Sequence, residues 1–229
     1  MASYVIAAIK SWNIENAEAI SARYPEHTFE IITDKAKLTA DALKKIDPQY
    51  IFFPHWSWII PEDIYGCFNC VVFHMTDLPF GRGGSPLQNL ISRGIYATKL
   101  SAIRVSGGID TGDIYDKEPV DIRFGNADQI LRKISSVIFH TMIPKFIEGS
   151  PTPCKQTGEA VVFKRRTPEQ SELPEGLSQR QIYDYIRMLD GEGYPAAYHK
   201  VPGGKIYYRN AKLTDGIVYA DAEFRRDTE

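Results

Sequence analysis

The stretch "VVFHMTDLPFGRGGSPLQNLI", residues 71–91, joins an apolar strand pattern to a helical pattern through a loop rich in turn-forming residues. β-Branched and aromatic side chains without polar alternation favour a strand that is buried on both faces. This strand ends on His74, and prolines and glycines follow within a few residues. Because ligands bind at the carboxyl ends of strands in an open parallel sheet, His74 is a candidate functional residue.

The chain on both sides of this stretch alternates strand patterns with helical patterns, which is typical of a parallel sheet covered by helices. Strand patterns occupy residues 3–9, 29–34, 50–54, 70–74 and 98–106, and a turn with a further strand occupies residues 107–122. Helical patterns occupy residues 13–24, with Asn13 as the expected cap, and residues 39–46, 86–94 and 126–149. The alternation predicts an α/β fold with an open, mostly parallel, Rossmann-like sheet.

The texture of the sequence changes after residue 149. A linker-like segment is followed by a short strand, a polar stretch, a helix and hairpin-like strands, at residues 150–160, 161–163, 164–176, 178–189 and 201–208. We expect a catalytic domain over residues 1–158 and a small C-terminal α+β or OB-like subdomain over residues 159–229.

Composition narrows the class of protein. The 229 residues are 43% hydrophobic and carry a net charge of −2, so no basic field of the whole chain recruits nucleic acid, and we expect no nucleic-acid partner. The apolar runs are too short and too interrupted to cross a bilayer, and the N-terminus has no signal-peptide pattern. We therefore expect a cytoplasmic protein without membrane contact.

Cysteine and histidine spacing gives no support for a metal. Cys67 and Cys70 in "CFNC" lack the second pair of ligands that a zinc site of this type needs. They are interpreted as small residues entering a strand, with a redox or metal role as the alternative. The five histidines show no HxxxH or HExxH spacing, so we expect no metal.

Asp110 is the residue that we expect to lie beside His74. It follows His74 by 36 residues, in "GGIDTGDIY". The turn-forming residues around it also fit a simple tight reversal. A carboxylate beside a histidine raises the pKa of the ring, fixes its orientation and accepts protons.

The segments "HMTDLPFGRGGSP" and "GIDTGDIY" resemble the signatures of the folate-dependent formyltransferases, a histidine in an HxSLLPxxxG loop and an LDTGD loop. The resemblance continues through "YIFFPHWSWIIPEDI", "VFKRRTPEQSEL" and "IRMLDGEGYPAAY" and covers about residues 48–212. The later segments look most like the sugar-nucleotide N-formyltransferases, such as the UDP-4-amino-arabinose formyltransferase domain and enzymes of pseudaminic-acid-type pathways. The resemblance implies the formyltransferase fold.

The implied activity is transfer of the formyl group of 10-formyltetrahydrofolate to the amine of a nucleotide-linked amino sugar, for surface polysaccharide or flagellar glycan synthesis. A proton must leave the attacking amine and another must reach the departing folate nitrogen. A histidine polarises the carbonyl or moves a proton near neutral pH. By resemblance, His74 and Asp110 are the catalytic residues.

Val72 departs from the family pattern, because the family has an asparagine two positions before the histidine. Loss of one oxyanion donor costs about 3 kcal/mol of transition-state stabilisation. Asn69 lies five residues before His74, on the opposite strand face, so backbone N–H groups or a water in the glycine loop are the better substitutes. A folate- or sugar-nucleotide-binding protein with weakened catalysis is therefore an alternative.

The resemblance also implies the binding residues. The pterin ring is expected beside "HWSWII", with a second loop closing the other side, through Trp56, Ser57, Trp58, Ile59, Ser106 and Ile109. Ordinary core packing is the alternative for the tryptophans. The expected substrate contacts are Lys10, Asn13, Thr76 and Arg82.

Two other enzymes that share this expected catalytic core are alternative functions for the chain. One formylates methionyl-tRNA, with an added loop after its second strand and a larger basic C-terminal domain, whereas this chain has only "DKAKLT" and a short C-terminal part. The other hydrolyses formyltetrahydrofolate. Aromatic residues in "KIYYRNAKL" suggest a homodimer.

Overall fold

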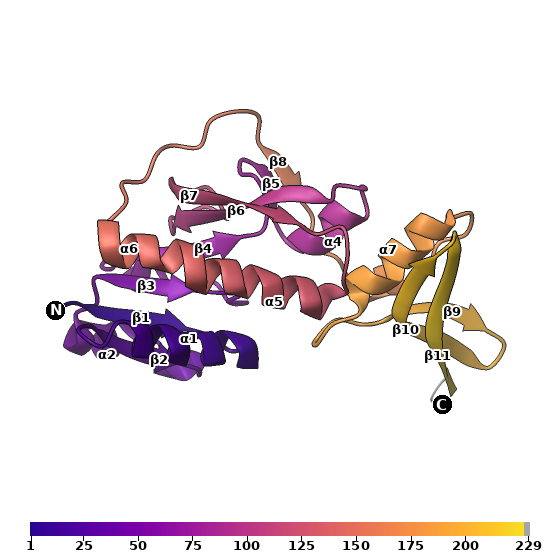
Figure 1. Ribbon diagram of the computed structural model, residues 1–229, viewed down its shortest axis with the longest axis horizontal. Coiled ribbons are helices and arrows are strands. Elements are labelled where there is room, and N and C mark those ends of the chain that lie inside the picture. Colours follow the sequence, from indigo (N-terminus) through magenta and orange to yellow (C-terminus); the bar gives the residue numbers. More distant parts are fainter. Residues whose placement is uncertain (227–229) are drawn as a thin grey trace. The chain divides into compact units, whose positions relative to one another are not determined.

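A computed structural model describes residues 1–226 of the chain. Its central sheet has six strands in the order β2-β1-β3-β4-β6-β7, of which the first four are parallel and β6 is antiparallel to β4. The predicted mostly parallel α/β sheet is therefore confirmed (Figure 1). The strands are β1 (Ser3–Ala7), β2 (Thr28–Ile32), β3 (Tyr50–Phe53), β4 (Cys70–His74), β6 (Ala97–Arg104) and β7 (Ile114–Asp121).

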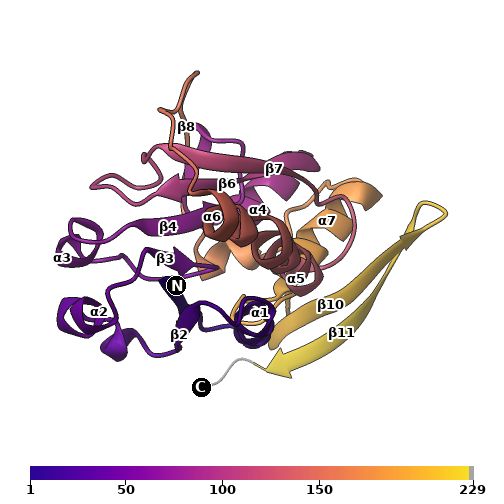
Figure 2. The ribbon, with the colours of Figure 1, turned by 60° about the vertical axis from the view of Figure 1, so that its left-hand side comes forward.

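Helices cover both faces of this sheet. Figure 2 shows α1 and α6 on one face and α2 and α3 on the other. Alternate residues of β1, β3 and β4 pack with α2 and α3 in a buried cluster that includes Val5, Ile51 and Cys70. The helices are α1 (Ser11–Arg23), α2 (Ala40–Ile46), α3 (Glu62–Tyr65), α4 (Pro86–Ile91), α5 (Ala127–Val137), α6 (Ile143–Gly149) and α7 (Gln179–Leu189), with short 3₁₀ turns η1 (Lys35–Lys37) and η3 (Pro168–Ser171).

The helix predicted over residues 126–149 is continuous, but its hydrogen-bond pattern changes partway along it. α5 and α6 are joined by a wider π-helical turn, η2 (Ile138–Met142). Pro144 follows this turn and has no N–H to donate to the carbonyl four residues earlier. The π-helical turn accommodates this missing donor within one continuous helical rod.

Residues 80–83, expected to be part of a turn, form a short strand instead. β5 (Phe80–Gly83) pairs with β8 (Val161–Phe163), the strand that ends the crossover from α6. The Val161 N–H donates to the carbonyl of Pro79 at 3.2 Å. The glycine loop after His74 is thus paired with a segment from a distant part of the sequence.

The chain divides into two compact units, each discontinuous in sequence. Unit 1 comprises Met1–Arg82, Lys99–Val120 and Arg132–Val162, and unit 2 comprises Gly83–Thr98, Asp121–Leu131 and the described residues from Phe163 onward. The boundary between a catalytic domain and a C-terminal subdomain at residue 158 stays a prediction. No helix among residues 1–226 is both long and apolar enough to span a bilayer.

Unit 2 contains the predicted C-terminal α+β appendage. α7 packs against a three-stranded antiparallel sheet in the order β11-β10-β9, with β9 (Ala197–Val201), β10 (Gly204–Thr214) and β11 (Ile217–Arg226). Its described strands form an open sheet rather than a closed OB barrel, and Figure 2 shows β10 and β11 as a long twisted ribbon. The aromatic side chains most exposed there are Tyr219 and Phe224 of β11, and a homodimer stays a prediction.

A buried arginine fastens α7 inside unit 2. Arg187 is 1% exposed, and its Nε donates to Asp184 Oδ1 at 2.6 Å. Its Nη1 donates to the carbonyls of Ile122 and Gly125, at 3.0 and 2.9 Å, and the guanidinium faces the ring of Tyr183. The side chain therefore joins the helix to the segment that precedes α5.

A second buried cluster fixes the end of β3 in unit 1. Asn13 is fully buried, and its Nδ2 donates to the carbonyl of Pro54 at 3.1 Å and lies 3.2 Å from His55 Nδ1. Its Oδ1 accepts from Ser135 Oγ at 2.7 Å. α1 begins at Ser11 rather than after Asn13, so the expectation that Asn13 caps this helix is wrong and its side chain is turned inward.

We predict that Arg187→Met lowers the free energy of unfolding by about 3 kcal/mol, because it removes a buried charge partner and leaves two carbonyls without a donor. Urea unfolding followed by circular dichroism measures the loss. Arg225→Met is the control, since Arg225 and Glu223 form an exposed pair. Equal effects of the two substitutions would contradict the structural role given to Arg187.

We also predict a pH dependence from His55. Burial and then the nearby Lys10 ammonium lower the pKa of this ring from 6.5 to about 4. The unfolded chain binds the proton more readily, so the contribution of neutral His55 is fully present above pH 6.5 and is lost as pH falls toward 4.

His55→Gln should therefore flatten the dependence of unfolding free energy on pH in this window, by up to about 3 kcal/mol. Urea unfolding at a series of pH values measures this. His140→Gln is the matched control, because His140 is exposed. If the unfolding free energy of the His55 variant depends on pH as steeply as that of the unmodified protein, the prediction is wrong.

Candidate active site

His74 lies at the carboxyl end of β4 and is 8% exposed. Its Nε2 lies 2.7 Å from the carbonyl oxygen of Gly81. Because a carbonyl oxygen only accepts, Nε2 carries a hydrogen and donates it. The other ring nitrogen, Nδ1, lies 3.4 Å from Asp110 Oδ2.

Asp110 lies in the connection between β6 and β7, and its side chain is 19% exposed. The 3.4 Å separation from His74 is longer than a normal N–H···O hydrogen bond. Catalytic hydrogen bonds are often long without substrate and shorten when it binds. The structure thus brings the two predicted catalytic residues together, as a loose pair at the sheet edge where ligands bind.

Hydrogen bonds from polar groups within and beside the loop after His74 hold its shape. Thr76 is fully buried, and its Oγ1 donates at 3.3 Å to the same Gly81 carbonyl that accepts from His74. The Thr76 carbonyl accepts from Ser101 Oγ at 2.7 Å. Thr76, expected as a substrate contact, therefore shapes the loop in this structure.

Two lysines anchor the same loop through Asp77, an arrangement that the sequence did not suggest. Lys117 Nζ lies 2.5 Å from Asp77 Oδ1 and from the carbonyl of Leu78, and Lys99 Nζ lies 3.1 Å from Asp77 Oδ2. Burial acts to raise the pKa of Asp77, but the hydrogen bonds from the two lysines lower it below its usual value. The carboxylate is therefore held in its charged form by one lysine from β6 and one from β7.

Arg82, expected to contact an anionic substrate, binds a glutamine in this structure. Its Nε and Nη2 donate to Gln156 Oε1 at 3.1 and 2.7 Å. Gln156 Nε2 donates to the carbonyls of Asp110 and Gly112, both at 2.8 Å. Gln156 lies in the segment interpreted as a linker, where nothing in the sequence pattern marked it.

The residues expected to bind folate lie on two loops of unit 1. Trp58, Ile59 and Ile109 are 40%, 88% and 72% exposed. The Trp56 and Trp58 rings meet edge to face at 4.8 Å, and Ser57 and Ser106 are exposed. Trp58 and Ile59 are therefore surface residues, whereas Trp56 is half-buried and packs against the buried cluster that contains Phe53.

The loop that carries Ser106 and Ile109 lies against α3. A Cβ placed on Gly107 would lie 3.6 Å from the hydroxyl of Tyr65 in this helix. α3 follows the tryptophan segment in the sequence. The roles of these residues in binding stay predictions.

Val72 is half-buried on β4, paired with Ile103 of β6 and Phe53 of β3. It shares a strand face with His74, where the family asparagine would stand. Asn69 precedes β4, and its Nδ2 donates to the carbonyl of Gln49 at 3.1 Å. Asn69 is therefore at the opposite end of the strand from His74 and does not replace the missing amide.

Lys10 and Asn13 lie near the carboxyl end of β1, but only one of them reaches the surface. Lys10 is half-buried at the start of α1, with its ammonium 5.5 Å from the centre of the Trp12 ring. Asn13 is buried and its amide is used inside unit 1. The amide of Asn13 is held by Pro54, His55 and Ser135, so of these two residues only Lys10 is placed to contact a ligand directly.

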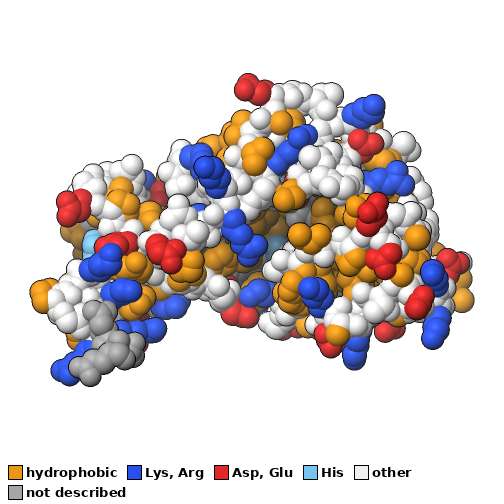
Figure 3. All heavy atoms as spheres, turned by 180° about the vertical axis from the view of Figure 1, so that it is seen from behind, with side chains coloured by type: hydrophobic (Ala, Val, Ile, Leu, Met, Phe, Trp, Pro, Cys, Tyr) orange, Lys and Arg blue, Asp and Glu red, His pale blue; other side chains and the backbone are white. Residues whose placement is uncertain are grey.

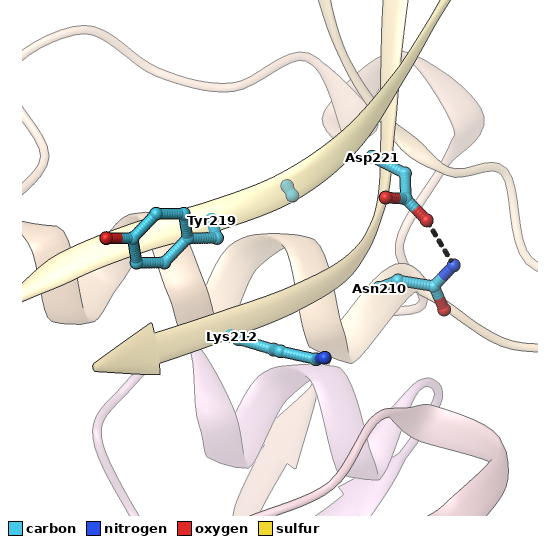
Figure 4. Close-up of a pocket in the computed structure, with 5 residues that line it drawn as sticks. Asn210, Lys212, Tyr219 and Asp221 are labelled. Atoms are coloured by element: carbon cyan, nitrogen blue, oxygen red, sulfur yellow. Dashed lines mark hydrogen bonds between the residues drawn. The ribbon is translucent and has the colours of Figure 1, made fainter.

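A pocket of about 440 Å³ lies in unit 2, on the ribbon of β10 and β11. It is lined by Asn210, Lys212, Tyr219, Ala220 and Asp221, and Asn210 Nδ2 donates to Asp221 Oδ2 at 2.7 Å (Figure 4). It contains none of the expected site residues. Figure 3 shows basic, acidic and hydrophobic side chains interspersed on one face of the molecule.

Comparison with known proteins identifies the family. A family model described as the C-terminal domain of methionyl-tRNA formyltransferase matches residues 168–225. The methionyl-tRNA formyltransferase of Bacillus licheniformis is 25% identical over 211 residues, which are 89% of this chain and 66% of the relative. The chain thus spans about two thirds or less of the curated relatives that it matches.

Solved structures agree. A structure named methionyl-tRNA formyltransferase from Clostridium thermocellum has 52% identity and a TM-score of 0.96, covering 99% of this chain and 100% of that one. HypX from Aquifex aeolicus in complex with tetrahydrofolic acid has 18% identity and a TM-score of 0.76, covering 91% of this chain and 37% of that one. The latter similarity shows the fold alone.

Two expectations from the sequence are wrong on these findings: a sugar-nucleotide acceptor, and the absence of a nucleic-acid partner. The family model, the curated relatives and the 52% identical structure all carry the name methionyl-tRNA formyltransferase, while sugar N-formyltransferases match at 14 to 17% identity.

The physical reason is that a net charge of −2 averages over the whole surface. Residues 197–226 contain six Lys or Arg and three Asp or Glu, an excess of three positive charges that the average conceals. The short C-terminal part also did not exclude methionyl-tRNA as the acceptor, since the C-terminal-domain model matches within it.

The predicted resemblance to formyltransferases is therefore confirmed at the level of the family. The His74–Asp110 pair stands at the carboxyl end of the expected strand, and a relative with 52% identity covers nearly the whole chain. On these grounds the chain belongs to the formyltransferase family.

Proposed function

We propose that this protein transfers the formyl group of 10-formyltetrahydrofolate to the amine of methionyl-tRNA. The observation that carries the proposal is the His74–Asp110 pair at the end of β4, in a chain 52% identical to a structure named methionyl-tRNA formyltransferase. The fold that it shares with a tetrahydrofolate complex of HypX supports a folate donor.

10-Formyltetrahydrofolate supplies the formyl carbon, which exchanges its bond to the folate nitrogen for a bond to the amine nitrogen. One proton leaves the attacking amine, and one proton reaches the departing folate nitrogen. His74 is fixed through Nε2, so Nδ1 is the ring atom that exchanges a proton or polarises the formyl oxygen. Asp110 faces Nδ1 and accepts the proton of the amine, directly or through a water.

The two exposed loops of unit 1 suit a flat heterocycle. Trp58, Ile59 and Ile109 offer apolar surface, which is the kind of lining that binds aromatic rings. Ser57 and Ser106 add hydroxyl groups at the same loops. We assign these side chains to the pterin ring, and Lys10 to the polar part of a reactant.

The tRNA needs phosphate contacts, which lysine and arginine supply. The excess of positive charge in β9 to β11 of unit 2 supports a contact there, within the segment matched by the C-terminal-domain model. These contacts position the tRNA and carry no base specificity. The basic residues are Lys200, Lys205, Arg209, Lys212, Arg225 and Arg226.

The first prediction of this proposal concerns the catalytic pair. The protein with 10-formyltetrahydrofolate should convert methionyl-tRNA to its formylated form, and His74→Ala or Asp110→Asn should lower kcat by about 100-fold or more, because each loses a proton-transfer group. Formylmethionine released from the tRNA is measured by mass spectrometry.

Asp113→Asn is the matched control in the same loop and should keep kcat within about twofold of the unmodified protein. Unchanged kcat in His74→Ala would overturn the catalytic assignment. If the protein does not formylate methionyl-tRNA at low salt but formylates another amine, the assignment of methionyl-tRNA as the acceptor is wrong.

The second prediction concerns Val72. Val72→Asn adds an amide donor on the strand face of His74 and should raise kcat by about 10-fold with KM little changed, because the donor acts on the developing oxyanion. Val72→Leu, which adds no donor, is the control. A lower kcat in a Val72→Asn protein that unfolds at the same urea concentration would show that the oxyanion lies elsewhere.

A further inference from the structure

Gln156 joins the two halves of the candidate active site. It is half-buried in the crossover between α6 and β8, in unit 1 with His74 and Asp110. Its side chain reaches the loop that follows His74 and the loop that carries Asp110. Its hydrogen bonds go to the Arg82 guanidinium and to two backbone carbonyls, so it acts on the reaction through the segments that it holds.

The amide of Gln156 is fully used by these contacts. Oε1 accepts two N–H groups of the Arg82 guanidinium, at 3.1 and 2.7 Å. Nε2 donates to the carbonyls of Asp110 and Gly112, both at 2.8 Å. Arginine has only donors and a carbonyl only accepts, so this position needs a side chain with both functions.

The contact on the Asp110 side holds a strained backbone. Asp110 has a φ of 53°, in the left-handed region that costs a non-glycine residue free energy. Gly112, two residues later, packs so closely that a Cβ there would lie 1.6 Å from the carbonyl oxygen of Arg104. Gln156 binds the carbonyls on both sides of this turn and thereby fixes where the carboxylate stands.

On the His74 side, the contact of Gln156 with Arg82 reaches His74 through the backbone. Arg82 directly follows Gly81, whose carbonyl accepts from His74 Nε2. By holding the Arg82 guanidinium, Gln156 restrains the residue next to the group that orients the imidazole. His74, Gly81, Arg82, Gln156 and Asp110 therefore form a closed ring of contacts, completed by the 3.4 Å approach of His74 to Asp110.

We propose that Gln156 is a positioning residue that sets the separation and orientation of His74 and Asp110 during formyl transfer. The inference rests on the proposed function. It assigns Arg82 to the same framework, as the cation that orients the glutamine amide. A misplacement of reacting groups by about 1 Å lowers rates by about 100-fold, so a small shift of either loop is enough to slow catalysis.

The test uses the full chain with Gln156→Glu, which keeps the size and the Arg82 contact but removes both donors and sets a carboxylate oxygen against two carbonyls. We expect kcat to fall by about 10- to 100-fold, with KM for 10-formyltetrahydrofolate and for the acceptor within twofold. Thr157→Ala is the matched control, because Thr157 is the exposed neighbour in the same segment and should leave kcat unchanged.

A double-mutant comparison separates positioning from general destabilisation. If Gln156 acts through Asp110, adding Gln156→Glu to Asp110→Asn should lower kcat by less than about threefold further, since residues that act as a unit are not additive. A protein that is merely destabilised would show the same fold-loss in both backgrounds. That additive result would overturn the proposal.

A readout independent of the acceptor is the set of NMR ring resonances of His74, assigned by their loss in His74→Gln. Gln156→Glu should displace the His74 resonances and leave those of His140 in place, even if methionyl-tRNA proves not to be the acceptor. Unmoved His74 resonances or an unchanged kcat would overturn the role of Gln156. Absence of formyl-methionyl-tRNA in the unmodified protein would overturn only the proposed function.

Discussion

The hydrogen bond from His74 Nε2 to the carbonyl of Gly81 is the contact on which the candidate site depends. It uses one ring nitrogen inside the protein and leaves Nδ1 to face Asp110. The bond requires the chain to reverse within seven residues, and Gly81 has a φ of 80°, which glycine adopts at little cost. Pairing of β5 with β8 and the two lysines on Asp77 keep this reversal in place.

Sequence reasoning could place His74 beside Asp110 because each residue has a local signal in the sequence. His74 ends an apolar strand, Asp110 sits in a turn motif, and the order of strands brings both to one edge of the sheet. Gln156 has no such local sign, since it lies in an irregular segment and its partners are 44 to 74 residues away. Its role depends on contacts between three segments, which no periodicity reports.

In the fold, too, features with a local sequence signal could be predicted and features that depend on distant contacts could not. Strands such as β3 and β4 could be predicted because burial on both faces imposes a continuous apolar run. β5 could not be predicted, because its pairing depends on where the crossover returns. Asn13 was misplaced for a related reason: a polar residue near a helix start suits a cap, but an earlier start at Ser11 turned its side chain into the interior.

Three cations whose side chains bind residues at the candidate site bear on how a charged acceptor is recognised. Arg82 is bound to the neutral amide of Gln156, and Lys99 and Lys117 are bound to Asp77, so these three side chains already stabilise the loop. A polyanion that recruited them would have to break contacts that hold His74 in place. Phosphate recognition by other cations leaves these contacts intact, and β9 to β11 of unit 2 carry a local excess of positive charge.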